Sequence, residues 1–156
     1  MSDASTPDTP TCAGRYTVDA GGPTHDADQI RKILVIEDEI GIRRALLHIL
    51  KLEGYHVAEA AHGEAGWDVV MEERPDLIIC DVEMPELNGY EFLARLKSTP
   101  EVAEVPFMFL TGKALLSDVE RGLAMGPDDY LIKPFTRAEI LLAIDRLETH
   151  LRDLKA

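Results

Sequence analysis

The 156-residue sequence has few of the features that mark secreted, membrane-spanning or disulfide-stabilised proteins. Its 2 cysteines, Cys12 and Cys80, match neither a disulfide framework nor the spacing of a metal site, which favours a reducing cytosol. No apolar stretch approaches the roughly 18 residues of a membrane span, and the N-terminus lacks a basic segment followed by an apolar one. We therefore expect a cytoplasmic protein without membrane association.

Positive charge is also scarce. The chain has 16 Lys and Arg residues against 29 Asp and Glu residues, so its formal net charge is -13 at pH 7. Nucleic-acid backbones are bound by clustered Lys and Arg, whereas the basic residues here are scattered along the sequence. We expect no direct binding to nucleic acid.

Composition divides the chain into two parts. Residues 1–29 are rich in Thr, Pro, Asp, Gly and Ala and have almost no large aliphatic side chains, so they cannot bury enough apolar surface to offset the entropy of ordering. They are predicted to form a flexible N-terminal tail. Residues 30–156 are predicted to form one globular domain, long enough for a two-faced core.

Short apolar runs alternate with amphipathic segments through this domain. The predicted strands are 33–36, 56–60, 77–80, 106–110 and 130–132. The predicted helices are 42–52, 64–73, 90–97, 115–125 and 136–154, the last one capped by Thr136. Five strands alternating with five helices indicate an α/β fold, a doubly wound parallel sheet with helices on both faces.

The spacing of apolar residues predicts the buried faces of the helices. The predicted core residues of the first three helices are Ile42, Ala45, Leu46, Ile49 and Leu50, then Ala65, Val69 and Val70, then Phe92, Leu93 and Leu96.

Polar residues follow four of the five predicted strands. Glu37 and Asp38 come after the first strand, Asp81 after the third, Thr111 after the fourth and Lys133 after the fifth. Because the carboxyl ends of parallel strands share one edge of the sheet, where open α/β sheets hold their ligands, these side chains are expected to meet.

Carboxylates gathered at one edge repel one another and raise each other's pKa unless a cation is present. Mg²⁺, a hard ion that prefers oxygen ligands, removes that cost, and Lys133 adds a compact positive charge. A site with Mg²⁺, an ammonium group, the Thr111 hydroxyl and the Asp81 carboxylate is equipped to bind and attack a phosphoryl group.

Four motifs, in order, carry a resemblance to a known family: ILVIEDE, DLIICDVEMPELNGYEFL, FLTGK and DDYLIKPF. With them the chain resembles the receiver domain of response regulators of bacterial two-component systems, over about residues 31–154. The resemblance implies the flavodoxin-like fold with five parallel strands in the order 2-1-3-4-5. The sequence ends after the fifth predicted helix, so we expect a receiver of the single-domain type.

The resemblance also implies roles for these residues. Asp81 matches the phosphoacceptor, and Glu37 and Asp38 match the acidic pair. Asp38 would bind Mg²⁺ directly, together with Asp81 and the backbone carbonyl of Glu83.

The remaining motif positions concern the phosphoryl group and the response to it. Lys133 would pair with the phosphoryl oxygens, and family members often have a cis peptide bond between this lysine and the next residue, Pro134. Thr111 would hydrogen-bond the phosphoryl group. Tyr130 matches the aromatic residue that changes rotamer on activation, although its position also suits a simple packing residue.

The resemblance further implies partners. The phosphoryl donor would be a histidine kinase or a histidine phosphotransfer protein, and the output would pass to a downstream effector protein. The face of the last helix is a candidate surface for a homodimer. Such a protein catalyses only its own phosphorylation and dephosphorylation.

Two alternatives stay open on the sequence. Asp81 with an acid two residues later also resembles the motif of phosphohydrolases that use an aspartate nucleophile, but those enzymes usually carry it on their first strand and need a longer chain. The chain also fits a receiver fragment of a longer regulator, continued from the closing helix.

Overall fold

The computed structural model describes residues 29–112 and 127–155. The predicted helix at 115–125 lies outside the described residues, as does all but the last residue of the predicted tail. The strands are β3 (Lys32–Ile36), β4 (His56–Ala60), β5 (Leu77–Asp81), β6 (Phe107–Gly112) and β7 (Asp129–Lys133). The helices are α1 (Ile40–Leu52), α2 (Gly63–Glu73), α3 (Gly89–Lys97) and α5 (Arg137–Lys155).

The strands form one five-stranded sheet in the order β4-β3-β5-β6-β7. Every neighbouring pair is parallel, so the carboxyl ends of all five strands point to the same edge. In chain order this is 2-1-3-4-5, the doubly wound arrangement expected from the sequence. The order reverses between β3 and β5, and open α/β sheets bind ligands at such a switch point.

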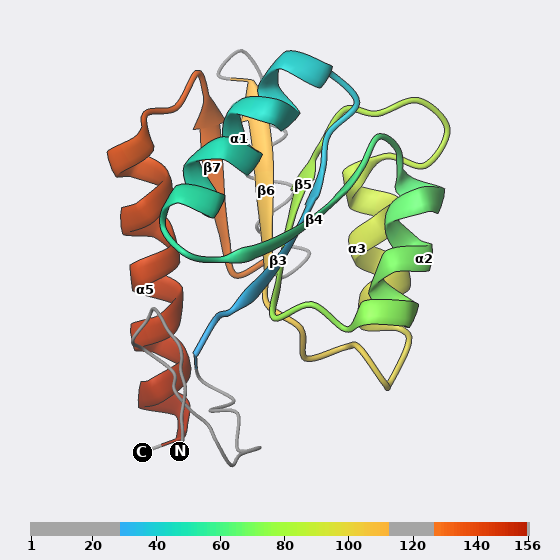
Figure 1. Cartoon of the computed structure of the whole chain (residues 1–156). Coiled ribbons are helices and arrows are strands. Elements are labelled where there is room, and N and C mark those ends of the chain that lie inside the picture. Colours follow the sequence, from blue (N-terminus) through green and yellow to red (C-terminus); the bar gives the residue numbers. More distant parts are fainter. Residues whose placement is uncertain (1–28, 113–126, 156) are drawn as a thin grey trace, which may run out of the picture.

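Helices cover both faces of the sheet (Figure 1). On one face, α1 and α5 pack over alternate residues of the strands and form one apolar core. On the other face, α2 and α3 form a second apolar core with the strand residues whose side chains point to that face. The central strand β5 is buried at all five positions, which explains its unbroken apolar sequence.

Two of the helices begin with reciprocal hydrogen bonds between side chain and backbone. At the start of α3, the Asn88 side chain accepts from the Glu91 N–H at 2.9 Å, and the Glu91 side chain accepts from the Asn88 N–H at 3.0 Å. Thr136 and Glu139 make the same exchange before α5, at 3.1 and 2.8 Å. These capping boxes satisfy backbone donors that have no partner within the helix. Thr136 is thus the cap that the sequence predicts.

The predicted core faces are correct for α2 and α3 and partly wrong for α1. Phe92, Leu93 and Leu96 are fully buried. In α1, however, Ala45 is exposed and Leu47 is buried, because the helix turns its face slightly from the predicted one. In α2 the predicted residues lie in or against the core, and Gly66 also packs on the sheet, where an added Cβ would lie 2.5 Å from the Ile36 side chain.

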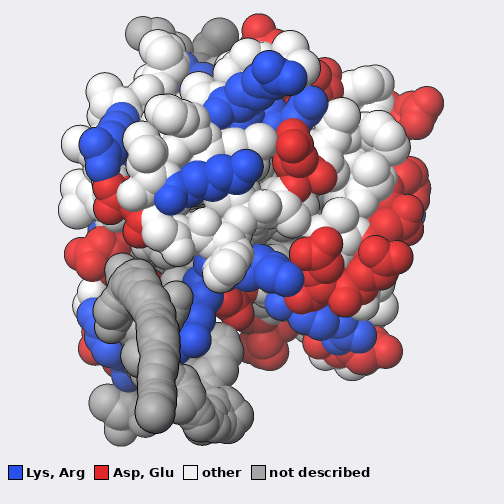
Figure 2. All heavy atoms as spheres, viewed as in Figure 1, with Lys and Arg blue, Asp and Glu red and all other residues white. Residues whose placement is uncertain are grey.

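Charge is unevenly distributed over the helices (Figure 2). The sequence of α1 contains Arg43, Arg44 and Lys51 and no acidic residue, whereas α2 contains four acidic residues and no Lys or Arg. The first helix is therefore a basic element in an acidic protein. Within the described ranges, none of the helices is both long and apolar enough to cross a membrane.

Candidate functional site

Three buried polar side chains lie at the carboxyl edge of the sheet. Glu37 follows β3 and is 0% exposed, Asp81 ends β5 at 4%, and Thr111 lies near the end of β6 at 1%. They are the three buried polar residues of the described part of the chain. Burying polar groups is costly, so their concentration at one edge indicates a site rather than packing.

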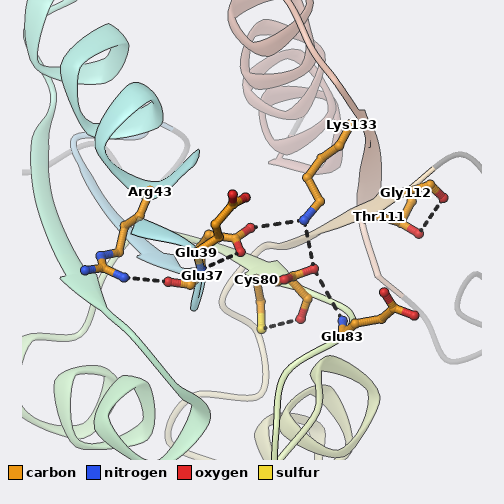
Figure 3. A network of polar contacts seen from close by, with 9 residues as sticks. Glu37, Glu39, Arg43, Cys80, Glu83, Thr111, Gly112 and Lys133 are labelled. Carbon is orange, nitrogen blue, oxygen red and sulfur yellow. Dashed lines mark hydrogen bonds and ion pairs between the residues drawn. The ribbon is translucent and has the colours of Figure 1, made fainter. Parts of the chain in front are cut away.

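Lys133, the last residue of β7, points into this group (Figure 3). Its Nζ lies 3.3 Å from Glu37 Oε1 and 3.4 Å from Asp81 Oδ1. The Lys133–Pro134 peptide bond is cis, which agrees with the expectation from the resemblance. One ammonium group thus bridges two buried carboxylates from two other strands.

The carboxylates of Glu37, Asp38 and Asp81 form a compact acidic trio. One oxygen atom from each lies within 4.8 Å of the others, and Asp38 is exposed while its two neighbours are buried. All the donor atoms are carboxylate oxygens, which suits a hard divalent cation such as Mg²⁺. The exposed Asp38 leaves the trio accessible from solvent, so these residues fit the ion that the sequence predicts.

Burial and crowding shift the protonation of the site. Burial raises the pKa of Glu37 to about 7, and the negative charge of Asp81 adds to the increase, while the Glu39 N–H and Lys133 oppose it. Burial also raises the pKa of Asp81, against the lowering effect of Lys133. Burial alone would lower the pKa of Lys133, but the attraction of Asp81 and Glu37 raises it overall. The site therefore holds more negative charge than one lysine balances.

Backbone donors fix both buried carboxylates. The Glu39 N–H donates to Glu37 Oε2 at 3.0 Å, and the Glu83 N–H donates to Asp81 Oδ1 at 3.3 Å. Both donors lie two residues after the carboxylate they serve. The loops after β3 and β5 therefore orient their own acidic side chains.

Gly89, at the end of the loop after β5, lies close to the backbone of Asp81 because it has no side chain. Its N–H donates to the Val82 carbonyl at 2.9 Å, and an added Cβ would lie 2.5 Å from the Asp81 carbonyl oxygen. No side chain fits in that space without moving the backbone of the site.

Thr111 and Tyr130 lie on neighbouring strands. The Thr111 hydroxyl donates to the Gly112 carbonyl at 3.3 Å, and Thr111 pairs with Ile132 in the register. Tyr130 pairs with Phe109 and packs against the core under α2 and α3. Because side chains alternate along a strand, Thr111 and Tyr130 are on the same face of the sheet.

Arg43 is a site neighbour that the sequence analysis did not identify. From the first turn of α1, its Nη1 donates to the backbone carbonyl of Glu37 at 2.8 Å (Figure 3). Its Nε donates to Glu59 Oε1 at the same distance. A charged residue in an amphipathic helix usually faces solvent, so the pattern alone gave no signal for this contact.

A family model described as the response regulator receiver domain matches residues 33–145. The chain belongs to this family. All of the site residues named in this subsection lie within the matched segment of this receiver domain.

The receiver domain is similar to proteins described as regulators. It is 41% identical over 112 residues to a probable transcriptional regulator ycf27 of Porphyridium aerugineum, covering 72% of this chain and 45% of that protein. It is 38% identical over 110 residues to response regulator MprA of Mycolicibacterium vanbaalenii, covering 70% of this chain and 47% of that protein. The chain thus spans about half the length of these relatives.

Solved structures share the fold. Chemotaxis protein CheY4 of Vibrio cholerae is 31% identical with a TM-score of 0.71, covering 76% of this chain and 99% of that one. A putative response regulator from Chloroflexus aurantiacus is 29% identical with a TM-score of 0.73, covering 78% and 99%. The five-stranded order of the sheet is therefore that of CheY-like receiver domains.

Proposed function

We propose that this receiver domain accepts a phosphoryl group on Asp81 and signals through the resulting change of its surface. The donor is a phosphohistidine on a histidine kinase or a histidine phosphotransfer protein. The observation that carries the proposal is the Asp81 carboxylate, buried at the sheet edge with Lys133 Nζ 3.4 Å away and two further carboxylates beside it.

Asp38 and Asp81, with the backbone carbonyl of Glu83, are the proposed ligands of Mg²⁺, and Glu37 supports them from its buried position. A bound Mg²⁺ would offset the excess negative charge of the trio and of the incoming phosphoryl group. The oxygen-only donor set supports this assignment.

Asp81 acts as the nucleophile. One of its carboxylate oxygens forms a bond to phosphorus while the bond between phosphorus and the histidine nitrogen breaks, and the imidazole leaves with the electron pair. Lys133 favours the ionised form of Asp81, since its charge opposes the effect of burial on the pKa of that carboxyl, and it then pairs with the phosphoryl oxygens. The Thr111 hydroxyl donates a hydrogen bond to the same group.

The product adds roughly one and a half to two negative charges next to Thr111. We infer that Thr111 moves toward the phosphoryl group and that Tyr130 turns into the space it leaves. Their position on one face of neighbouring strands supports such coupling. The changed surface would then bind a downstream effector protein, with the face of α5 as the candidate surface for a homodimer.

The proposal is tested by the mass of the intact protein after incubation with Mg²⁺ and a small acyl phosphate. We expect the gain of one phosphoryl group that is labile to hydroxylamine and absent from Asp81→Asn. If neither the acyl phosphate nor a panel of phosphorylated histidine kinases phosphorylates the protein, the proposal is wrong.

The same experiment separates a receiver from a phosphohydrolase with an aspartate nucleophile. A receiver modifies only itself, so a small phosphate ester should not be turned over. Multiple turnovers that depend on Asp81 would instead establish the phosphohydrolase.

A further inference from the structure

The polar groups of Glu37 are all paired, and one of the partners is a side chain of the helix α1. Its N–H donates to the Ala60 carbonyl at 3.1 Å. Its side-chain oxygens accept from Lys133 at 3.3 Å and from the Glu39 N–H at 3.0 Å. Its backbone carbonyl accepts from Arg43 Nη1 at 2.8 Å, so a side chain of α1 completes the set.

Arg43 is itself held in place. Its side chain is 14% exposed, and its Nε forms an ion pair with Glu59 on β4 at 2.8 Å. Its backbone N–H donates to the Glu39 carbonyl at 3.0 Å, in the first turn of the helix. The guanidinium group therefore links the edge strand β4 to the loop between β3 and α1, using the fixed fork of donors that arginine offers.

The carbonyl that Arg43 binds belongs to the peptide unit between Glu37 and Asp38. Since a peptide unit is planar, a hydrogen bond to its oxygen fixes the orientation of the whole unit and the direction in which the Asp38 backbone continues. In residues 29–112 and 127–155, no protein hydrogen bond reaches the Asp38 carboxylate, and Asp38 is exposed. Its placement in the trio therefore depends on its backbone.

We propose that Arg43 is a positioning residue for the acidic trio, holding the peptide unit of Glu37 and Asp38 so that Asp38 faces the other two carboxylates. The inference rests on the proposed function, because it assigns Arg43 to the Mg²⁺ site. Arg43 acts on the ion through the backbone and does not touch the ion itself.

The sign of the effect distinguishes positioning from charge. A guanidinium close to a cation site repels the cation, so by charge alone the loss of Arg43 would strengthen Mg²⁺ binding. The Glu59 carboxylate at 2.8 Å largely cancels that charge. If Arg43 instead positions the trio, its loss weakens Mg²⁺ binding.

The test is calorimetric titration of the full chain with Mg²⁺ alone. We expect Arg43→Met to weaken the affinity about tenfold, a typical cost for losing a residue that orients a metal ligand. Arg44→Met is the matched control, because Arg44 is the exposed neighbour on α1 and the variant loses the same charge. Equal or tighter binding by Arg43→Met than by Arg44→Met would overturn the inference.

Two further variants keep the test decisive if Arg43→Met does not fold. Arg43→Lys retains a donor for the Glu37 carbonyl and should recover part of the affinity. Glu59→Gln retains Arg43 but removes its anchor, and should weaken Mg²⁺ binding by about threefold, less than the usual cost of losing an outer partner because Arg43 itself remains. Unchanged affinity in both variants would also overturn the inference.

The titration and the phosphorylation assay test the two proposals independently. If the order of Mg²⁺ affinities holds but the wild-type chain is never phosphorylated on Asp81, the positioning role stands and the proposed phosphotransfer is wrong. If Asp81 is phosphorylated but Arg43→Met and Arg44→Met bind Mg²⁺ alike, the proposed function stands and the role of Arg43 is wrong. A wild-type chain that binds no Mg²⁺ contradicts both the metal site and the inference.

Discussion

At the amino end of the sheet, carboxylates accept hydrogen bonds from strand backbone, whereas at the carboxyl end they lie against one another. Asp76 Oδ2 accepts from the N–H groups of Arg31 and Lys32, both at 2.9 Å. Asp128 accepts from the N–H of Phe107, the first residue of β6, at 2.8 Å. Each of these carboxylates satisfies a backbone donor where a strand begins, and this is a structural role.

The carboxyl end has the opposite arrangement. Glu37 and Asp81 each accept one backbone N–H, but they also share a lysine and lie beside Asp38. Their pKa values are raised, mainly by burial. The comparison shows that a carboxylate at a strand end becomes a candidate for chemistry when its neighbours are other carboxylates and a lysine.

The largest expected difference between the two ends is in phosphorylation. Asp81→Asn should abolish it, because the amide cannot act as the nucleophile. Asp76→Asn makes the same chemical change at the amino end and should be phosphorylated like the wild type. Intact-protein mass after treatment with acyl phosphate and Mg²⁺ measures both variants. Equal phosphorylation of the two would remove the distinction between the ends.

The next largest difference is expected between substitutions of one lysine at each end of the sheet, measured as the rate of phosphorylation. Lys133→Met should slow phosphorylation of Asp81 by about 100-fold to 1,000-fold, the usual cost of losing one group that stabilises developing charge. Lys32 pairs with Glu73 on the surface at 3.1 Å, so Lys32→Met should leave the rate unchanged. A stopped-time series of phosphoprotein mass gives both rates. A Lys133→Met rate within threefold of wild type contradicts the role of this lysine.

Acidic crowding at the carboxyl end also predicts how stability depends on pH. In the folded protein Glu37 keeps its proton up to a pKa of about 7, whereas in the unfolded chain it loses it near 4.5. Between these values the folded state binds more protons, so the free energy of unfolding contributed by Glu37 falls as pH rises. The loss is roughly 3 kcal/mol in the absence of metal.

Comparison with Glu37→Gln isolates this effect, because other titrating groups are common to both proteins. The wild type should lose stability relative to the variant between pH 4.5 and pH 7, measured by urea unfolding in the presence of a chelator. Saturating Mg²⁺ should reduce the slope, since the ion favours the ionised carboxylates. Parallel stability curves without metal would show that Glu37 ionises normally.

The smallest expected effect is a change of stability at the amino end. Asp76→Ala leaves the N–H groups of Arg31 and Lys32 without their acceptor and should lower the free energy of unfolding by about 1 to 2 kcal/mol. Asp81→Asn, in the absence of metal, should instead raise it slightly, because it removes a carboxylate whose ionisation the fold disfavours. Urea unfolding at neutral pH measures both. A loss of stability in both variants would contradict the comparison.

The strands and the site edge could be predicted from the sequence for a physical reason. Strands buried on both faces appear as unbroken apolar runs, as in β5, and the polar residue that ends each run is conspicuous. A parallel sheet then brings Glu37, Asp81, Thr111 and Lys133 to one edge without further information. The roles of these residues stay predictions.

The parts that could not be predicted depend on contacts between elements. Gly66 packs directly on Ile36 because it has no side chain, and a pattern of apolar residues does not register such a position. Gly89 lies against the Asp81 carbonyl for the same reason. Arg43 appears in the sequence as one more surface charge, and only the path of the preceding loop brings the Glu37 carbonyl within its reach.

The most direct test of the account is to locate the phosphoryl group in the chain. After phosphorylation with Mg²⁺ and an acyl phosphate, borohydride reduction converts a phosphorylated aspartate to homoserine, which fragment mass spectrometry assigns to one residue. We predict homoserine at position 81 and unmodified aspartate at Asp38, Asp76 and Asp128. Homoserine at any of these other positions, or a phosphoryl group held on a histidine, would contradict it.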